Sequence, residues 1–281
     1  MFTQNKILNV AFYSFAPWKD HNLEPLQSEL KKACENLGIR GNILLSPEGL
    51  NAFLACEPLS LESFLAHWVP VLSQEPWCLP PFEVKKSWSL QQPFRKLLVK
   101  IRREIIAFGV EGIDPLKRTA PRLASKELAQ WLDAGREVVL LDTRNDYELA
   151  VGTFEGALDP KLRNFREFPA RLRELAPEIR DKPVVMFCTG GIRCEKATAL
   201  ALEEGFTEVY QLDGGILKYF EETGGAHWKG ECFVFDHRVA VDGQLKPSER
   251  VGECFDCRQP LLPHQLGTPC SEHQRPLDRC Q

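Results

Sequence analysis

Cys188 begins a loop whose residue types and spacing suit nucleophilic chemistry. It directly follows the apolar run VVMF and opens the stretch CTGGIRC at residues 188–194. Gly190 and Gly191 permit backbone angles that turn successive N–H groups toward one point, and the helix expected after them adds its positive end. Arg193 supplies a fixed positive charge. Because each of these features favours thiolate over thiol, we expect Cys188 to be a catalytic nucleophile assisted by Arg193.

The remaining loop residues have supporting or undetermined roles. Thr189 and Ile192 complete the loop between Cys188 and the helix. Cys194 lies in the first turn of that helix, where it either resolves a disulfide or persulfide formed on Cys188 or packs as a small apolar residue. The alternative for Cys188 itself is a buried, inert thiol at a strand end. A merely structural thiol requires neither the glycine pair nor Arg193, so the functional interpretation is favoured.

The distance along the chain between Cys188 and Arg193 narrows the chemistry. Four residues separate the two. A phosphatase loop of this kind has one residue more, because its ring must enclose a tetrahedral phosphate. The shorter loop suits a smaller group, such as the outer sulfur of a persulfide. The spacing therefore favours sulfur or redox chemistry over cleavage of phosphate esters.

Composition excludes several classes of protein. The chain has 281 residues, 43% of them hydrophobic, and its formal net charge of −4 gives no global signature of nucleic-acid binding. No apolar stretch is long enough to span a membrane, and the start of the sequence lacks the pattern of a secretion signal. We therefore expect a cytoplasmic protein with no membrane or DNA partner, whose ten cysteines stay reduced, bind metal or act as nucleophiles. The sequence does not determine the oligomeric state.

The first part of the chain has the pattern of a split β-α-β fold. Apolar and aromatic runs that predict strands are interrupted by two helical stretches, and a Ser-Pro-Glu-Gly turn joins two of the strands. The expected strands are 7–15, 39–45, 51–55, 82–88 and 97–101, and the expected helices are 23–37 and 59–68. This order predicts a ferredoxin-like or acylphosphatase-like α/β domain over 1–113.

After a proline-containing linker at 114–121, the pattern becomes a regular alternation of helix and strand. Ser125 is the expected N-cap of the first helix, which Gly135 should end. Buried strands are expected at 138–142, 183–187 and 209–212, and a helix at 194–204. The alternation predicts a parallel α/β sheet over 122–225. Cys188 then lies at the C-terminal edge of this sheet, where such folds bind ligands.

Three stretches of this second domain resemble the rhodanese family. They are LLDTRNDYEL, GTFEGALDP and FCTGGIRCEKA, in the order in which rhodanese domains have them. The resemblance implies a rhodanese-like fold in which Cys188 to Arg193 form the active-site loop. It also implies that Asp142 and Arg144, together with Glu148, brace the fold near that loop.

The resemblance extends over nearly the whole chain. RGNILLSPEGLNAFLA at 40–55, the CTGGIRCEKA loop and GECFVFDHRVAVD at 230–242 together look like the bacterial rhodanese-like tRNA uridine hydroxylases, the TrhO family. This similarity implies an enzyme that uses molecular oxygen to convert the wobble uridine of tRNA, at position 34, to 5-hydroxyuridine. Cys188 matches the essential cysteine of that family. Two other functions stay open: a sulfurtransferase that carries sulfane sulfur on Cys188, and a non-catalytic module that binds RNA or a partner.

A basic stretch between residues 85 and 103 is the expected contact with tRNA. It holds seven Lys or Arg and no Asp or Glu, with Trp88 and Phe94 among them. The candidate phosphate contacts are Lys85, Lys86, Arg95, Lys96, Lys100, Arg102 and Arg103. The two aromatic residues are candidates to stack on unpaired anticodon bases. A solvated strand face with buried aromatic residues is an equal alternative.

Activation of oxygen normally requires a metal, a flavin or another source of electrons. The sequence has neither the His-x-Asp/Glu pair of a non-haem iron site nor a Gly-x-Gly-x-x-Gly flavin fingerprint. The motifs of this sequence therefore identify no oxygen-activating cofactor, and the electron donor is undetermined. Cys188 either adds to C6 of uracil, which makes C5 electron-rich toward an oxidant, or carries a persulfide that acts as the reductant.

Residues 226–281 lose the regular period and gain proline and cysteine, so we expect them to wrap the preceding domain or to fold around a metal. Two pairs of ligands, each with two residues between its members, stand twelve residues apart, as in structural zinc sites. The candidate ligands are Cys254, Cys257, Cys270 and His273, with Cys280, His264 or no metal at all as alternatives. Four protein ligands leave no open position, so this zinc would be structural.

Overall fold

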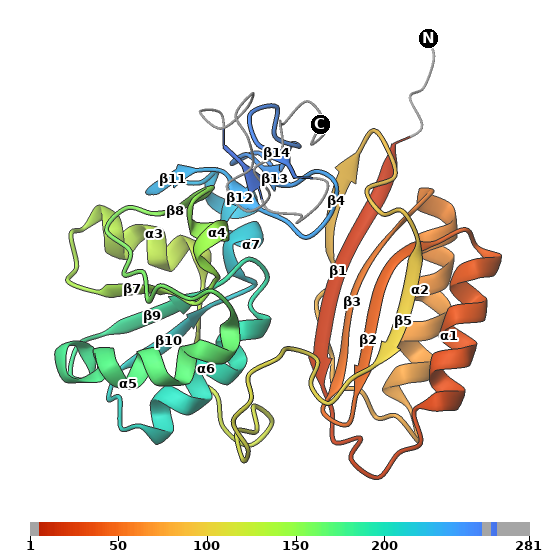
Figure 1. The fold of residues 1–281 in the computed structure, drawn as a ribbon, viewed down its shortest axis with the longest axis horizontal. Helices are drawn as coiled ribbons and strands as arrows, with labels where there is room; N and C mark the ends of the chain where they lie inside the picture. Colours follow the sequence, from red (N-terminus) through yellow and green to blue (C-terminus); the bar gives the residue numbers. More distant parts are fainter. Residues whose placement is uncertain (1–5, 255–259, 263–281) are drawn as a thin grey trace. The chain divides into compact units, whose positions relative to one another are not determined.

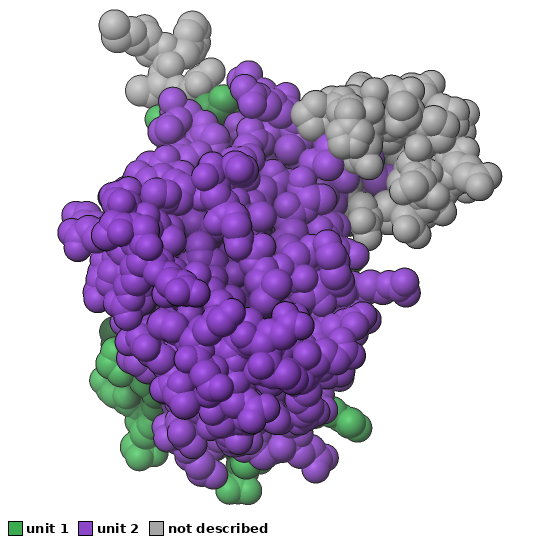
Figure 2. All heavy atoms as spheres, turned by 90° about the vertical axis from the view of Figure 1, so that its left-hand side faces the viewer, with its two compact units in different colours: residues 1–107 green, residues 108–281 purple. Residues whose placement is uncertain are grey.

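The computed structural model describes residues 6–254 and 260–262, and the chain divides into two compact units (Figure 1). Unit 1 is Met1–Ala107 and unit 2 is Phe108–Gln281, and Figure 2 shows them in different colours. Each unit has a hydrophobic core of its own. Among the described residues, no helix combines the length and the apolar character needed to cross a membrane.

Unit 1 contains one five-stranded sheet with the split β-α-β topology that the sequence predicts. Its strands are β1 (Ile7–Phe15), β2 (Arg40–Ser46), β3 (Gly49–Cys56), β4 (Lys85–Ser89) and β5 (Leu97–Ile101). The order across the sheet is β4-β1-β3-β2-β5. Because β3 pairs antiparallel with both β1 and β2, these two strands run parallel with β3 between them. β5 pairs parallel with β2, and β4 pairs antiparallel with β1.

Two helices, α1 (Glu24–Asn36) and α2 (Pro58–Ser73), cover one face of this sheet (Figure 1). Alternation along β1 turns Leu8, Val10 and Phe12 toward that face, where they join the apolar residues of both helices in one core cluster. The residues that alternate with these core residues along each strand therefore belong to the opposite face of the sheet.

Unit 2 is built on a four-stranded sheet in which all neighbouring strands are parallel, as predicted. Its strands are β6 (Arg122–Leu123), β7 (Val139–Asp142), β9 (Val184–Phe187) and β10 (Val209–Leu212), in the order β6-β10-β9-β7. All four residues of β9 are buried. A strand covered on both faces is apolar throughout, which explains the run VVMF before Cys188.

Helices flank this sheet. They are α3 (Ser125–Asp133), α4 (Asp146–Leu149), α5 (Phe168–Ile179), α6 (Ile192–Glu203) and α7 (Gly215–Thr223), with a 3-10 turn at Phe165–Glu167. The prediction that Ser125 caps α3 is wrong, because Ala124 is the N-cap and Ser125 is the first helical residue. The Ser125 hydroxyl is buried and has no hydrogen-bond partner among the described residues. The helix ends before Gly135 as predicted, and Gly135 has a φ of 64°.

The described residues after α7 pack against the preceding α/β domain, while the expectation that residues 226–281 as a whole wrap that domain stays a prediction. β11 (Trp228–Gly230) pairs antiparallel with β8 (Gly152–Phe154), and the Trp228 and Phe154 ring centroids lie 5.0 Å apart. Two further antiparallel pairs follow. They are β12 (Cys232–Phe233) with β13 (Ala240–Val241), and β14 (Gly252–Glu253) with β15 (Pro260–Leu261).

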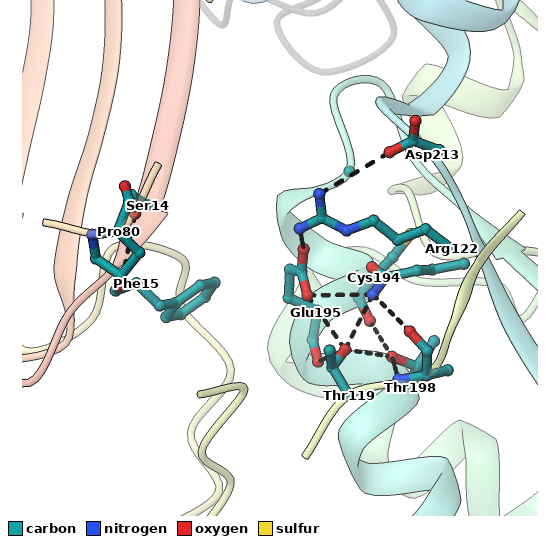
Figure 3. Close-up of polar contacts among 12 residues, drawn as sticks. Ser14, Phe15, Pro80, Thr119, Arg122, Cys194, Glu195, Thr198 and Asp213 are labelled. Carbon is teal, nitrogen blue, oxygen red and sulfur yellow. Dashed lines mark hydrogen bonds and ion pairs between the residues drawn. The ribbon is translucent and has the colours of Figure 1, made fainter. Parts of the chain in front are cut away.

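Residues 114–121, expected as a linker, belong to unit 2. The Thr119 hydroxyl lies 3.0 Å from the Thr198 hydroxyl of α6 and donates a hydrogen bond to the Glu195 carboxylate at 3.1 Å (Figure 3). Arg122 donates to the same carboxylate at 2.7 Å. The segment is therefore fixed to the helix that follows the Cys188 loop.

Candidate active site

Cys188 directly follows β9, an inner strand of the parallel sheet, and its side chain is buried, with 1% exposed. Its carbonyl oxygen accepts a hydrogen bond from the N–H of Ile216 at 3.0 Å, and the Thr189 carbonyl accepts one from the N–H of Leu217 at 3.1 Å. Both donors belong to the first turn of α7, where N–H groups lack partners within the helix. The start of α7 thus fixes the loop backbone.

The loop amides stabilise a thiolate at Cys188. The N–H of Gly191 donates to Sγ of Cys188 at 3.1 Å, and Gly191 is also the N-cap of α6, with a φ of 96°. Burial raises the pKa of Cys188. The hydrogen bond from the Cys194 thiol, the charge of Arg193, and the N–H groups of Arg193 and Gly191 outweigh burial and lower this pKa to about 6. Cys188 is therefore ionised at neutral pH.

Cys194, in the first turn of α6, is the neutral partner of this thiolate. Its thiol donates a hydrogen bond to Cys188, and its sulfur lies 3.8 Å from the hydroxyl oxygen of Thr143. Burial and the neighbouring Cys188 thiolate raise the pKa of Cys194 well above its ordinary value. Cys194 is thus the hydrogen-bond donor to the Cys188 thiolate, while its role as a resolving cysteine stays a prediction.

Arg193 is buried and paired with Glu148 of α4. Its two terminal nitrogens donate to the two carboxylate oxygens at 2.7 and 2.8 Å, and the Thr189 hydroxyl donates to the same carboxylate at 3.5 Å. The residues between Cys188 and Arg193 are buried, except for the half-buried Gly190. A bidentate pair holds the guanidinium in one orientation. Arg193 therefore acts on the sulfur through a fixed charge, and Glu148 positions that charge.

Asp142 and Arg144 form a second ion pair whose side chains are fully buried. Arg144 donates to the Asp142 carboxylate at 2.6 Å and to the carbonyl of Gly152 at 2.7 Å, and the Thr153 hydroxyl donates to the same carboxylate at 2.8 Å. Burial lowers the pKa of Arg144, but the Asp142 charge more than offsets burial, so the net shift is upward. These contacts tie the end of β7 to β8, which gives the pair a supporting role.

The segment after α7 places two aromatic side chains close to buried arginines of the site. Neither aromatic residue is among the catalytic residues expected from the sequence. The ring of Trp228 lies 5.1 Å from the guanidinium carbon of Arg144, and the ring of Phe235 lies 5.7 Å from that of Arg193. Burial raises the pKa of Cys232 to about 12, so this thiol is neutral and suited to packing. These contacts are tertiary, so spacing alone does not reveal them.

The seven basic residues expected to contact RNA do not form one continuous strip. Lys85 and Lys86 lie on β4, at one edge of the sheet of unit 1, and the other five lie in or next to β5, at the opposite edge. Phe94 is 9% exposed and is not available for stacking on a base, whereas Trp88 is 47% exposed. The topology therefore divides a group that is continuous in the sequence.

Of the four candidate zinc ligands, Cys254 lies within the described residues and is buried. Cys257, Cys270 and His273 lie outside the described residues. Within residues 6–254 and 260–262, no group of three or more His, Cys, Asp or Glu side chains is arranged to hold a metal ion. The zinc site stays a prediction.

The comparison with known proteins agrees with the architecture. Residues 7–105 match the UPF0176 acylphosphatase-like domain, and residues 124–222 match the rhodanese-like domain. Among solved structures, the rhodanese-like domain of an Anabaena protein is similar, with a TM-score of 0.34 and 18% identity, over 40% of this chain and 80% of that chain.

Two curated relatives match much more of the chain. A protein named tRNA uridine(34) hydroxylase from Cupriavidus taiwanensis is 43% identical over 269 residues, which cover 94% of this chain and 93% of that protein. A protein of the same name from Burkholderia cenocepacia is 45% identical over 271 residues, with the same shares. Matches of this extent include both units rather than the rhodanese-like domain alone. The chain therefore belongs to the tRNA uridine(34) hydroxylase family.

Proposed function

We propose that this protein hydroxylates C5 of uridine 34 in tRNA, with molecular oxygen as the co-substrate, in the cytoplasm where tRNA is modified. The observation that carries this proposal is the match, over 94% of the chain, to relatives named for hydroxylation of that uridine. The Cys188 thiolate supports it, because the reaction acts on an electron-poor double bond that a thiolate can attack.

The net reaction sets a requirement for electrons. Uridine, O2, two electrons and two protons give 5-hydroxyuridine and water, so an external two-electron donor takes part. In the mechanism below a soluble reductant supplies these electrons, because Cys188 is needed there as a thiolate. A persulfide on Cys188 that acts as the reductant is the alternative mechanism.

In the proposed mechanism, Cys188 is both nucleophile and leaving group. Its sulfur electron pair forms a bond to C6 of uracil, and the C5–C6 π electrons move toward C5 and the O4 carbonyl. The two-electron donor reduces O2 to the peroxide level, and C5 attacks one oxygen of this species while the O–O bond breaks and the other oxygen leaves as water. Loss of the C5 proton and cleavage of the S–C6 bond restore the double bond and release the thiolate. A thiolate with a lowered pKa leaves readily, which suits the last step.

The sheet of unit 1 supports the proposal of a tRNA contact. Lys85 pairs with Ala11, whose chain neighbours on both sides face the core, so Lys85 belongs to the opposite face. Lys100 pairs with Leu44, which is joined through Asn51 to Tyr13. Tyr13 is two residues from Ala11 on β1, so Lys100 belongs to the same face as Lys85. The Lys85 ammonium lies 5.7 Å from the centre of the Tyr13 ring. The two lysines flank a face about 19 Å wide, at about 4.8 Å per strand, which we propose receives the anticodon arm.

The test uses purified protein, a tRNA that lacks the modification, labelled oxygen and a chemical two-electron donor. Mass analysis of nucleoside 34 is expected to show one labelled oxygen atom with the wild type and none with Cys188→Ala. If the wild type forms no 5-hydroxyuridine with any of the two-electron donors tested, the result contradicts the proposed function. Full activity of Cys188→Ala contradicts the mechanism but leaves the function in place.

Sulfur transfer is the second candidate function, because the domain over 124–222 matches the rhodanese-like family and a thiolate at Cys188 can carry sulfane sulfur. Incubation with thiosulfate and cyanide distinguishes the two. Rapid, catalytic release of thiocyanate without hydroxylation of tRNA favours the sulfurtransferase. If Cys188→Ala restores 5-hydroxyuridine in a strain that lacks the gene, while the purified wild type neither hydroxylates tRNA nor releases thiocyanate, the protein is instead a binding module.

A structural zinc ion at Cys254, Cys257, Cys270 and His273 remains a separate proposal that rests on ligand spacing. Metal analysis of the purified protein is expected to find about one zinc per chain, and less in Cys254→Ser. A wild-type zinc content far below that value contradicts the proposal.

A further inference from the structure

Phe235 is a large aromatic side chain that unit 2 leaves in solvent. The residue is 45% exposed, while its neighbours Phe233 and Val234 are 6% and 5% exposed. It follows β12 and opens the connection to β13. A single exposed apolar residue requires no explanation by itself. The structure of the turn and its position near the catalytic loop distinguish this one.

The turn that presents Phe235 is held rigidly. The Asp236 carboxylate accepts hydrogen bonds from the backbone N–H of Arg238 at 2.9 Å and from its guanidinium at 2.6 Å. The N–H of Val234 donates to the carbonyl of Val239 at 2.8 Å, and Val239 has a φ of 61°. The Asp236 and Arg238 side chains are almost fully buried. The Phe235 ring is therefore presented from a fixed backbone.

The ring lies beside the catalytic loop. Its centre is 5.7 Å from the guanidinium carbon of Arg193, which two hydrogen bonds to Glu148 hold in place. On another side, the Phe233 ring packs against Phe235 edge to face, with 5.1 Å between ring centres. The ring is thus fixed relative to the last residue of the Cys188–Arg193 loop, with nearly half of its surface open to solvent.

We propose that Phe235 is the residue on which the pyrimidine ring of the target uridine stacks, an inference that rests on the proposed function. An anticodon base is unpaired, so its flat face is available to an aromatic side chain. A base held on Phe235 lies next to the loop that carries the nucleophile. Phe235 thereby positions the base, and Cys188 and Arg193 perform the chemistry.

The experiment compares aromatic and aliphatic residues at this position. Phe235→Tyr and Phe235→Trp keep a flat ring, Phe235→Leu keeps apolar surface without one, and Leu116→Ala is a control at a side chain of similar exposure (47%) in the same unit. The measurements are the affinity for an anticodon stem-loop RNA with uridine at position 34, and kcat/KM for hydroxylation. Phe235→Leu is expected to lose roughly 5- to 150-fold in affinity, while both aromatic variants and Leu116→Ala stay close to the wild type.

A second RNA isolates the stacking contact. In a stem-loop with an abasic nucleotide at position 34, wild type and Phe235→Leu should bind equally, because no base is left to stack. The pH midpoint of Cys188 alkylation should be the same in both proteins, because the Arg193–Glu148 pair is intact.

Each contrary result overturns the inference. If Phe235→Leu binds the uridine RNA as tightly as the wild type does, Phe235 is not a stacking residue. If its loss of affinity persists with the abasic RNA, Phe235 contacts another part of the RNA or a partner. A shifted Cys188 midpoint indicates a structural role through the loop. Because affinity is measured without turnover, a wild type that binds the RNA but does not hydroxylate it contradicts the proposed function and not this inference.

Discussion

At the scale of the residue, the pKa values of two neighbouring cysteines shift in opposite directions: Cys188 loses its proton and Cys194 keeps its own. Both are buried, which by itself opposes ionisation of each. Cys188 follows the strand and accepts the N–H of Gly191, whereas Cys194 is the donor and faces a negative sulfur. The position of the amides and of Arg193 therefore decides which of the two sulfurs becomes a thiolate.

This asymmetry predicts the pH dependence of Cys188. Above pH 6 it is a thiolate, and as the pH falls through about 6 it gains a proton, so its reactivity and the activity should both fall. Alkylation by a small haloacetamide, followed by peptide mass analysis, should give a midpoint near 6. Cys194→Ala should raise that midpoint, because the thiol that donates to Cys188 is gone. The exposed Cys78, whose raised pKa comes mainly from a hydrogen bond with Glu75, is the internal reference. A Cys188 midpoint at the ordinary value of about 8.5 contradicts the prediction.

The buried pair of Arg193 and Glu148 predicts a large effect on stability. Glu148→Gln leaves a buried guanidinium without its counter-charge, which should lower the free energy of unfolding of unit 2 by about 3–5 kcal/mol. Urea denaturation measures this loss. The matched control is Glu174→Gln, which breaks an exposed pair with Arg171 and should cost at most about 1 kcal/mol. If the two substitutions lower the free energy of unfolding by the same amount, the buried pair stabilises unit 2 no more than the exposed pair does.

At the scale of the element, two helices hold the Cys188 loop. The helix α6 begins within the loop, and the start of α7 binds the loop backbone. Gly215, the first residue of α7, has a φ of 69°, and a Cβ built there would lie 2.4 Å from the Cys188 carbonyl oxygen. Only a glycine permits the close approach through which α7 donates its first N–H groups to the loop. The geometry of the nucleophile thus depends on a helix that starts 27 residues later in the chain.

Gly215→Ala tests this dependence. The new methyl group must displace the loop carbonyl, so the substitution should destabilise unit 2, raise the pKa of Cys188 toward its ordinary value and reduce activity. Gly224→Ala is the control: its φ of 66° imposes similar backbone strain, of order 1–3 kcal/mol, but no atom lies within 4 Å of the new Cβ. Thermal unfolding and the alkylation midpoint measure the two effects. If both variants keep the midpoint of the wild type, the contact with α7 does not shape the loop.

At the scale of the whole molecule, the two units supply different parts of the proposed reaction. Unit 2 holds every residue of the thiolate site, and the lysines proposed to contact phosphate belong to unit 1. Binding and chemistry should therefore respond to separate substitutions.

Lys85→Gln and Lys100→Gln should weaken tRNA binding without changing the alkylation midpoint of Cys188. Each should also reduce the slope of log affinity against log salt by about 1, since each removes one phosphate contact. Lys31→Gln is the control, because Lys31 lies on α1, which covers the other face of the sheet. Titration of labelled tRNA at several salt concentrations measures these slopes. An unchanged slope in both variants contradicts the assignment of that face to RNA.

Local pattern was sufficient for much of the fold. The strands at 7–15, 97–101 and 209–212 have the predicted bounds, because apolar runs bounded by turn residues are local signals. Where tertiary packing decides, prediction failed. The helix expected to end at 68 continues to Ser73 through Pro70, and burial of Leu72 in the core offsets the hydrogen bond that the proline removes. The burial of Phe94 and the division of the basic residues between two sheet edges likewise follow from strand order.

The sequence by itself was sufficient to predict that Cys188 is the thiol with the lowered pKa, because strand, glycine pair, arginine and helix lie within a dozen residues of it and act through short-range contacts. Only the tertiary structure decided what holds that thiol in place. Gly215 and Phe235 lie 27 and 47 residues from Cys188, and chain folding alone brings them to the loop. The resemblance already implied that Glu148 lies near the loop, but only the structure shows its bidentate pair with Arg193. Long-range contacts of this kind leave no periodic or spacing signal in one sequence, since their partners are set by the order of strands in the sheet.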